Sequence, residues 1–305
     1  MQNLGRINEY TIISIKHEVA NRISYLAKND ETQTNYIIEF KKNNTPDFPA
    51  NEINILNILN NANSPYLLHY IRNENGQLIL NGKEPRNKSY IIFEDASKYD
   101  LYNYINKFGL GEKNAKLIFF KIITGIQAMH NLNICHRNIN TSNILFDANY
   151  NPKICGFYYS CINANNFQDQ IGSEGYMAPE ILANRQYDGK KADIFSLGQL
   201  LFNLVTGLRG FESANNSDHY YRYIKQKNYE KYFNLLEPML EKNLSDEFKH
   251  LYVRMIAYEP NERPTIDEIL NDPWVQEINN FMQALENEVV TEMKQREMTI
   301  KMEHI

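Results

Sequence analysis

The stretch "ICHRNINTSNILF", residues 134–146, decides how the rest of this chain is interpreted. A His-Arg pair leads within a few residues to Asn143, whose amide oxygen is of the kind that binds hard cations. Between them stands Asn138, and an amide cannot accept a proton as a carboxylate base does. The loop therefore has the polar side chains of a reactive site but no carboxylate.

The composition is that of an ordinary globular protein. Of the 305 residues, 43% are hydrophobic and 23% are charged. The net charge is −5 and the lysines are scattered, which argues against binding to nucleic acid or to an anionic membrane. We find neither a signal peptide nor an apolar run of the ~18 residues needed to span a bilayer. We expect a cytoplasmic protein, with cytoskeletal association and the nucleus as open alternatives.

Three cysteines, Cys135, Cys155 and Cys161, are odd in number. Their spacing matches no zinc site and no disulfide framework. We expect them to be reduced thiols in a cytosolic protein, and Cys135 and Cys155 to be small buried hydrophobic residues.

Hydrophobic spacing predicts an α+β fold. Residues 10–40 read as strands around a polar turn, and residues 50–62 as a short helix. Two more strands are expected around a polar hairpin that contains Gly76 and Gly82. Helical patterns follow from Asp100 onward. A small β-rich part thus precedes a larger α-helical part.

Several motifs, in this order along the chain, resemble those of the eukaryotic protein kinase family, specifically its Ser/Thr kinases. The opening stretch resembles the catalytic loop "HRDLxxxNILL". Three later stretches resemble the end of the activation segment, a central helix and the C-terminal signature: "GSEGYMAPEIL", "KADIFSLG" and "AYEPNERPTIDEIL".

The resemblance implies a bilobal, protein-kinase-like fold with a β-rich N-lobe and a larger helical C-lobe. The expected boundaries are an N-terminal extension over 1–9, a domain over 10–275 with lobes of about 10–95 and 96–275, and an amphipathic helical tail over 276–305. Apolar residues recur at helical spacing along that tail. We expect the tail either to lie on the large lobe or to insert into a partner protein.

At the phosphate-binding positions that the resemblance implies, this chain departs from the family. The three loop glycines align with His17, Val19 and Arg22, where Cβ atoms would fill the space of phosphate oxygens. The strand lysine that pairs with phosphates aligns with Glu39, which reverses the charge. Ile37 replaces a small residue and is expected to occlude the base pocket.

The family's helix glutamate is retained as Glu52. Two neighbouring acids, Glu39 and Glu52, repel each other. We therefore expect either a displaced helix or a bridging cation, such as Arg22 or Lys41.

The catalytic positions depart as well. Asn138 stands where the family has the Asp base, and Asn140 replaces a lysine that steadies the transferring phosphate. Gly156 replaces the metal-binding aspartate of the "DFG" motif, so that Asn143 alone remains as a metal ligand. One neutral amide is a poor site for Mg²⁺.

Positions that the resemblance identifies as structural are retained. A stack joining the lobes would consist of Leu56, Tyr70, His136 and Phe157, anchored by Asp193. Glu180 is placed to pair with Arg263. Asp169 occupies the position that is usually phosphorylated and is expected to pair with Arg137.

From these departures we expect a pseudokinase: a non-enzymatic scaffold with no cofactor, no metal and no ATP binding, because catalytic groups act as a unit. Its partners would be other proteins, either an active kinase that it regulates or a larger assembly, for which a cytoskeletal one is an open alternative. Two alternatives stay open. One is an atypical Ser/Thr kinase with relocated groups, such as Lys16 or Lys28, and the other is a nucleotide-binding switch without transfer.

Overall fold

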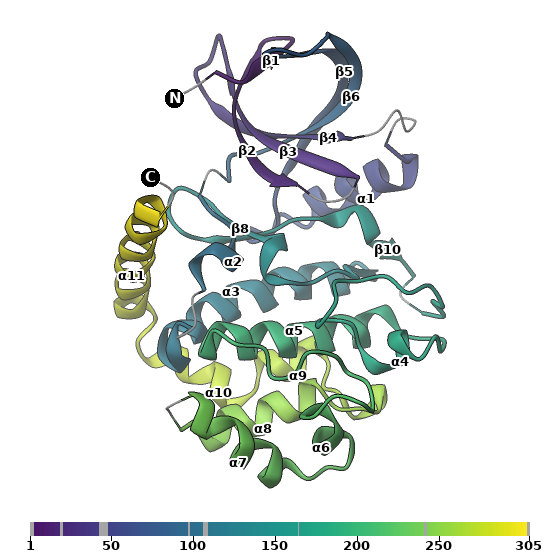
Figure 1. Cartoon of the computed structure of the whole chain (residues 1–305), viewed down its shortest axis with the longest axis vertical. Coiled ribbons are helices and arrows are strands. Elements are labelled where there is room, and N and C mark those ends of the chain that lie inside the picture. The colour runs from purple at the N-terminus through teal and green to yellow at the C-terminus, as the bar shows by residue number, and fades with distance from the viewer. Residues whose placement is uncertain are drawn as a thin grey trace. The chain divides into compact units, whose positions relative to one another are not determined.

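The computed structural model describes residues 3–18, 21–42, 48–96, 98–105, 109–163, 165–240 and 243–303. The chain divides into two compact units (Figure 1). Unit 1 contains residues 1–99 and 145–155, and unit 2 contains residues 100–144 and 156–305. Each unit is described separately.

Unit 1 is built around a closed six-stranded barrel, with the strand order β1-β2-β3-β4-β6-β5 (Figure 1). The strands are β1 (Gly5–Ile7), β2 (Tyr10–Glu18), β3 (Arg22–Asn29), β4 (Asn35–Lys41), β5 (Tyr70–Leu80) and β6 (Arg86–Phe93). The short strand β1 closes the barrel because it pairs antiparallel with β2 on one side and with β5 on the other.

The barrel interior is a hydrophobic core. Alternate side chains of each strand face inward, as the two-residue period of a strand requires. The fully buried members include Ile7, Ile12, Ile38 and Tyr90. Ile37 is one residue from Ile38 and therefore faces the other side of the sheet, where it is also buried.

Outside the barrel, unit 1 contains helix α1 (Ala50–Asn61) and the two-stranded sheet of β8 (Ile144–Phe146) and β9 (Pro152–Ile154). Helix α1 buries Ile55, Leu56 and Leu59 on one face and packs on β5. Glu52 lies in its first turn, where a carboxylate interacts favourably with the helix dipole.

Unit 2 is mainly helical. Its long helices are α3 (Gly111–Asn131), α5 (Gly189–Thr206) and α11 (Met282–Glu303), joined by the shorter α2 (Leu101–Tyr104), α4 (Pro179–Leu182), α6 (Tyr221–Lys225), α7 (Tyr229–Leu240), α8 (Asp246–Met255), α9 (Ile266–Leu270) and α10 (Pro273–Gln276). Strands β7 (Ile134–Cys135) and β10 (Cys161–Ile162) form a small antiparallel sheet. Short 3-10 turns are η1 (Thr141–Asn143), η2 (Phe157–Tyr159), η3 (Pro260–Glu262) and η4 (Glu277–Asn280).

Helix α5 is the centre of unit 2, and its ends follow from its sequence. The Asp188 side chain caps the N-terminus by accepting hydrogen bonds from the backbone N–H groups of Lys190 and Lys191. Gly207 ends the helix in the left-handed conformation, at φ 80°. Between them nearly every residue is buried, so the apolar run of the sequence becomes the core of the unit.

Two local predictions were wrong. Residues 5–7 fall in the segment that we assigned to an extension, yet they form β1 within the barrel. Gly76 was expected in a hairpin turn but lies inside β5, because the turn comes later, around Gly82.

Helix α11, in the predicted C-terminal tail, packs on α2 and α3 within unit 2. Leu285, Val289 and Met293 are its buried face, and their exposed fractions are 4% or less. Arg296 donates hydrogen bonds to the backbone oxygens of Tyr104 and Gly109. Of the two alternatives for the apolar stripe, the structure shows burial against the chain's own helices.

No helix in the described ranges has the combination of length and apolar character that crossing a membrane requires.

The barrel core makes a stability prediction at β1. Replacing the fully buried Ile7 by alanine leaves a cavity, and we expect a loss of about 2–5 kcal/mol in the free energy of unfolding. The matched control is Arg6→Ala at the exposed neighbouring position, which should change this free energy by about 0.5 kcal/mol or less. Denaturant unfolding of the full chain measures both. Equal effects of the two variants would mean that β1 is not part of the folded barrel.

Candidate functional site

A buried charge cluster joins β3, β4 and α1 in unit 1. Arg22 Nη1 donates a hydrogen bond to Glu39 Oε1 at 2.6 Å. The two terminal nitrogens of the same guanidinium donate to the two Glu52 oxygens at 2.7 and 2.8 Å. The side chains of Arg22 and Glu52 are only 6% and 7% exposed. One cation therefore holds two carboxylates that would otherwise repel each other.

Strand register explains why these groups meet. In the antiparallel pair of β3 and β4, Ser24 lies opposite Glu39. Arg22 is two residues from Ser24 and therefore shares its face, on the diagonal from Glu39. The Ser24 hydroxyl also donates a hydrogen bond to Glu39, at 3.3 Å.

Burial and charge act in opposite directions on this cluster. Burial alone would lower the pKa of Arg22, but the Glu52 and Glu39 carboxylates outweigh it and raise the pKa above its ordinary value. Burial, with the nearby Glu39 charge, raises the pKa of Glu52 in spite of its hydrogen bonds to Arg22. The Arg22 guanidinium therefore stays charged, and Glu52 is protonated more easily than an exposed glutamate because it is buried.

Arg22 was predicted as a degenerate loop position, and the structure places it in a strand as the bridging cation. The other candidate, Lys41, has its Nζ 5.5 Å from the centre of the Phe48 ring. His17 lies in β2 opposite Ser24. Val19 is outside the described residues. Ile37 lies in β4 between Leu26 and Phe93 on the neighbouring strands.

The loop of residues 136–143 in unit 2 is held by one buried carboxylate. Asp193 accepts hydrogen bonds from the backbone N–H groups of His136 and Arg137, both at 2.8 Å. His130 Nε2 lies 3.0 Å from the same carboxylate. Asp193 is 1% exposed, so both of its oxygens need these partners. These hydrogen bonds hold the Arg137 backbone at φ 67°, a conformation that residues other than glycine rarely adopt.

Asn138 takes part in a network of neutral hydrogen bonds. Its Oδ1 accepts from Ser173 Oγ at 2.8 Å, and its Nδ2 donates to Tyr158 Oη at 3.1 Å. Asn140 Nδ2 donates to Ser173 Oγ at 2.9 Å. Asn140 also caps η1 through its side-chain oxygen. These side chains can orient a hydroxyl group, but none of the amides can remove its proton.

The positions that hold a metal in the family, Asn143 and Gly156, do not fit Mg²⁺ in this chain. Asn143 Nδ2 donates to the Asn138 backbone oxygen at 2.8 Å, which orients the Asn143 amide. A Cβ atom on Gly156 would come within 2.6 Å of Asn143 Oδ1, so no carboxylate could stand there without displacing that amide. Within the described ranges, no group of three His, Cys, Asp or Glu side chains is placed to hold a metal ion. Mg²⁺ prefers carboxylates and oxygen ligands in an octahedral array.

Arg137, in the loop after β7, contacts three side chains that follow β10. Its Nη2 donates hydrogen bonds to an Asp169 carboxylate oxygen and, at 2.9 Å, to Tyr187 Oη. Its guanidinium lies 4.1 Å from the centre of the Phe167 ring, within cation–π range. The structure therefore brings together Arg137 and Asp169, the pair expected from the sequence.

The charge of Asp169 is stabilised by this pair. Partial burial would raise the pKa of Asp169, but the hydrogen bond and charge of Arg137 outweigh that effect and lower the pKa below its ordinary value. Asp169 is accordingly a permanent negative charge on the segment at neutral pH.

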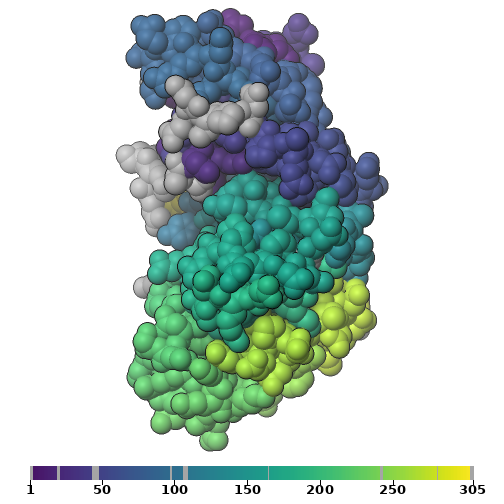
Figure 2. All heavy atoms as spheres, turned by 90° about the vertical axis from the view of Figure 1, so that its right-hand side faces the viewer, coloured from purple at the N-terminus to yellow at the C-terminus, as the bar shows by residue number. Residues whose placement is uncertain are grey.

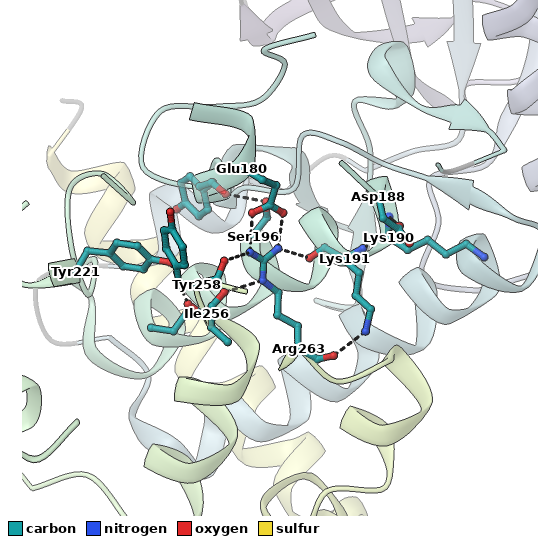
Figure 3. A network of polar contacts seen from close by, with 11 residues as sticks. Glu180, Asp188, Lys190, Lys191, Ser196, Tyr221, Ile256, Tyr258 and Arg263 are labelled. Carbon is teal, nitrogen blue, oxygen red and sulfur yellow. Dashed lines mark hydrogen bonds and ion pairs between the residues drawn. The ribbon is translucent and has the colours of Figure 1, made fainter. Parts of the chain in front are cut away.

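Glu180 and Arg263 form a fully buried ion pair (Figure 3). The two Glu180 oxygens accept from Arg263 at 2.6 and 2.7 Å, and the Lys191 carbonyl accepts from the same guanidinium at 3.0 Å. The side chains of Glu180 and Arg263 are 2% and 0% exposed. Figure 2 shows the teal segment that contains Glu180 beside the yellow-green segment that contains Arg263. The pair joins segments that are far apart in the chain.

The four residues of the predicted stack lie in both units. In unit 1, Leu56 and Tyr70 are buried on α1 and β5, which pack together. In unit 2, the rings of His136 and Phe157 are 5.6 Å apart between centroids. The stack as a whole stays a prediction.

Three side chains of the site were not predicted from the sequence: Ser173, Tyr158 and Tyr187. Ser173 belongs to the stretch "GSEGYMAPEIL", which resembles the end of the activation segment, so the sequence contained a signal for its place in the site. Tyr158 is the third residue of the stretch aligned with "DFG", but nothing in the sequence indicated its contact with Asn138. Tyr187 had no signal, because its contact arises only from folding of the chain onto the loop.

The protein kinase domain model matches residues 23–275. The chain is 34% identical over 194 residues to the serine/threonine-protein kinase SRK2G of Arabidopsis thaliana. The aligned region covers 60% of this chain and 52% of that protein. It is 33% identical over 189 residues to the serine/threonine-protein kinase SAPK2 of Oryza sativa subsp. indica, covering 60% and 55%. The chain spans about half the length of these curated relatives.

This chain belongs to the protein kinase family. Because its relatives are Ser/Thr protein kinases by name, the prediction of a non-enzymatic pseudokinase scaffold without ATP binding was wrong. That prediction rested on the replacement of several catalytic positions at once, among them Glu39, Asn138 and Gly156.

The Arg22 cluster predicts a strong stability effect. In Arg22→Met two buried carboxylates lose their cation, and we expect the free energy of unfolding at pH 7 to fall by about 3–5 kcal/mol. The double variant Arg22→Met/Glu39→Gln removes the repulsion and should recover part of this loss.

The pH dependence supplies a second measurement of that cluster. Without Arg22, burial and the Glu39 charge should hold the folded-state pKa of Glu52 still further above its unfolded value. The resulting stabilisation is present at pH below about 4.3 and is lost as pH rises through the folded pKa. Denaturant unfolding at pH 4 and pH 7 tests this, and an Arg22→Met penalty that is the same at both values would contradict it.

Asp169 predicts a small, pH-dependent effect. Its lowered folded-state pKa stabilises the fold above the unfolded pKa of about 3.9, and this contribution is lost as pH falls through the folded pKa. Because the carboxylate is half exposed, Asp169→Asn should cost only about 0.5 kcal/mol.

The same substitution should increase proteolysis within residues 160–176. The control is Glu174→Gln, an exposed acid of that segment. If Asp169→Asn and its control are cleaved at the same rate, the ion pair does not order the segment.

Proposed function

We propose that this chain is an atypical Ser/Thr protein kinase, which transfers phosphate from ATP to a protein hydroxyl with its phosphate-site cation relocated from β4 to β3. The supporting observation is the bidentate pairing of Arg22 with Glu52, at 2.7 and 2.8 Å. In the family this glutamate pairs with the strand lysine that Glu39 replaces. In this proposal units 1 and 2 are the N-lobe and C-lobe of the bilobal fold.

The charge of the cluster supports a role for Arg22 with phosphate. A guanidinium is planar and always charged, and it binds carboxylates and phosphates with the same two-pronged geometry. In the free protein Glu39 and Glu52 share it. A triphosphate would compete with Glu39, the more exposed of the two acids at 17%, while Glu52 keeps Arg22 in place.

The loop in unit 2 supports positioning of the acceptor hydroxyl rather than its deprotonation. Phosphoryl transfer needs mainly alignment and charge stabilisation, because its transition state is loose. Ser173 Oγ donates its proton to Asn138 Oδ1 at 2.8 Å, and both oxygens keep acceptor capacity for such a hydroxyl. Loss of a general base costs a factor of about 10²–10⁴ in rate, so the expected activity is slow.

Metal ions have no step in this proposal, because the residues around Asn143 and Gly156 do not fit Mg²⁺. We therefore expect transfer to depend less on divalent cations than it does in relatives that keep both aspartates.

The test is transfer of γ-labelled phosphate from ATP to casein or to the chain itself, with Mg²⁺, with Mn²⁺ and with EDTA. We expect slow labelling of serine or threonine by the wild type, retained by Arg22→Lys and reduced at least tenfold in Arg22→Met. The control, Arg72→Met, removes a half-exposed arginine of the same unit and should leave labelling unchanged. Circular dichroism identifies any variant that fails to fold.

The proposal is overturned if the wild type transfers no phosphate, or if Arg22→Met transfers it as fast as the wild type. A thermal shift with ATP separates the remaining alternative, a nucleotide-binding switch. A dissociation constant of about 10 μM would stabilise the fold by ~2.7 kcal/mol at millimolar ATP. A shift without transfer would identify a switch.

On composition alone we further propose that the partners are other proteins, such as an active kinase or a multi-protein assembly, and that the protein acts in the cytoplasm. The support is the net charge of −5 and the scattered lysines, which do not favour nucleic acid or anionic membranes.

A further inference from the structure

Two of the three cysteines lie directly opposite each other in the small sheet of unit 2. Cys161 on β10 is the cross-strand partner of Cys135 on β7. Directly opposed residues of an antiparallel pair have Cα atoms about 4.5–5.5 Å apart. Disulfides span Cα distances of about 4.4–6.8 Å, so the backbone already has a spacing that a disulfide can bridge.

Both side chains also face the same group of residues. Opposed residues in a sheet point to the same face. Arg137 Nη1 donates a hydrogen bond to Cys161 Sγ at 3.4 Å, and this guanidinium lies over the Phe167 ring. Cys135 Sγ and Phe167 both lie within 3.0 Å of the place that a Cβ on Gly189 would occupy. Cys135 Sγ is also 3.6 Å from the Cys161 backbone oxygen.

The two thiols differ in access to solvent. Cys161 is half-buried and can be reached by a small oxidant, whereas Cys135 is fully buried. Burial raises the pKa of the Cys135 thiol, so this sulfur is protonated and is a poor nucleophile toward dissolved reagents. The pair therefore has one partly accessible thiol and one buried thiol directly opposite it.

We propose that Cys161 and Cys135 form a reversible disulfide when a hydroperoxide oxidises Cys161. Cys161 Sγ attacks the peroxide oxygen, the O–O bond breaks, and the products are a sulfenic acid on Cys161 and an alcohol or water. The Arg137 guanidinium beside the sulfur stabilises negative charge on the departing oxygen.

In the second step Cys135 Sγ attacks the Cys161 sulfur. The S–S bond forms, the S–OH bond breaks, and water leaves with the proton of Cys135. Two thiols lose two electrons in total and the peroxide gains them.

The bridge would act on the segment that Arg137 organises. Cys161 Sγ, Asp169 and Tyr187 share the Arg137 guanidinium in the reduced protein. Drawing the sulfur toward Cys135 removes one of these partners and ties β10 covalently to the strand that precedes the loop. The inference concerns a modification site and does not depend on phosphate transfer.

The test uses the full chain, reduced and then exposed to hydrogen peroxide. We expect two of the three thiols to disappear from a maleimide count in denaturant, and dithiothreitol to restore them. Trypsin leaves Cys155 and Cys161 on one peptide, so chymotrypsin is used to cleave at residues 157–159 between them. Mass spectrometry should then find a Cys135–Cys161 linked pair that is two hydrogens lighter than its free peptides.

Three variants separate the steps. Cys161→Ser should abolish the loss of thiols, and Cys135→Ser should stop at a sulfenic acid on Cys161 that dimedone traps. The matched control, Cys155→Ser, should form the bridge at the wild-type rate. The proposal is overturned if Cys155 is oxidised first, if the bridge joins any other pair, or if wild-type Cys161 accumulates as sulfenic acid without a disulfide.

Discussion

The shape of the loop in unit 2 depends on the buried carboxylate of Asp193. It accepts the backbone N–H groups of His136 and Arg137 and lies beside His130, with almost no access to water. A buried carboxylate without such partners costs several kcal/mol, so loop and helix α5 order each other. These hydrogen bonds hold the Arg137 backbone in the strained left-handed conformation. In that conformation the Arg137 guanidinium points toward the segment that follows β10.

Unit 1 has a cation beside Glu52, although it comes from a different strand than the family pattern predicts. A position-by-position comparison with the family finds an acid, Glu39, where a cation belongs. The fold supplies the cation from Arg22, because antiparallel pairing places residues of β3 diagonally across from β4. The charge around Glu52 therefore has to be counted over all the side chains that contact it in space, and a linear motif does not show those contacts.

Much of the fold was predictable because long periodic segments and ordered motifs signal it strongly. The apolar run of α5 follows from the sequence pattern, and the Arg137–Asp169 and Glu180–Arg263 pairs follow from the resemblance to the family. Strand β1 was missed because three residues have no measurable period. The hydrogen bond of Asn138 to Tyr158 depends on how the chain folds after β9, which no local pattern encodes.

Closure of the barrel by β1 has a consequence for how unit 1 can meet other proteins. An open sheet has two outer strands whose backbone N–H and C=O groups are available to an incoming extended peptide. In the barrel of β1–β6, β1 occupies the free side of β2 at Tyr10–Ile12 and that of β5 at Leu78–Leu80. At these residues an incoming strand has no free backbone groups to pair with, so contacts with other proteins there are left to side chains.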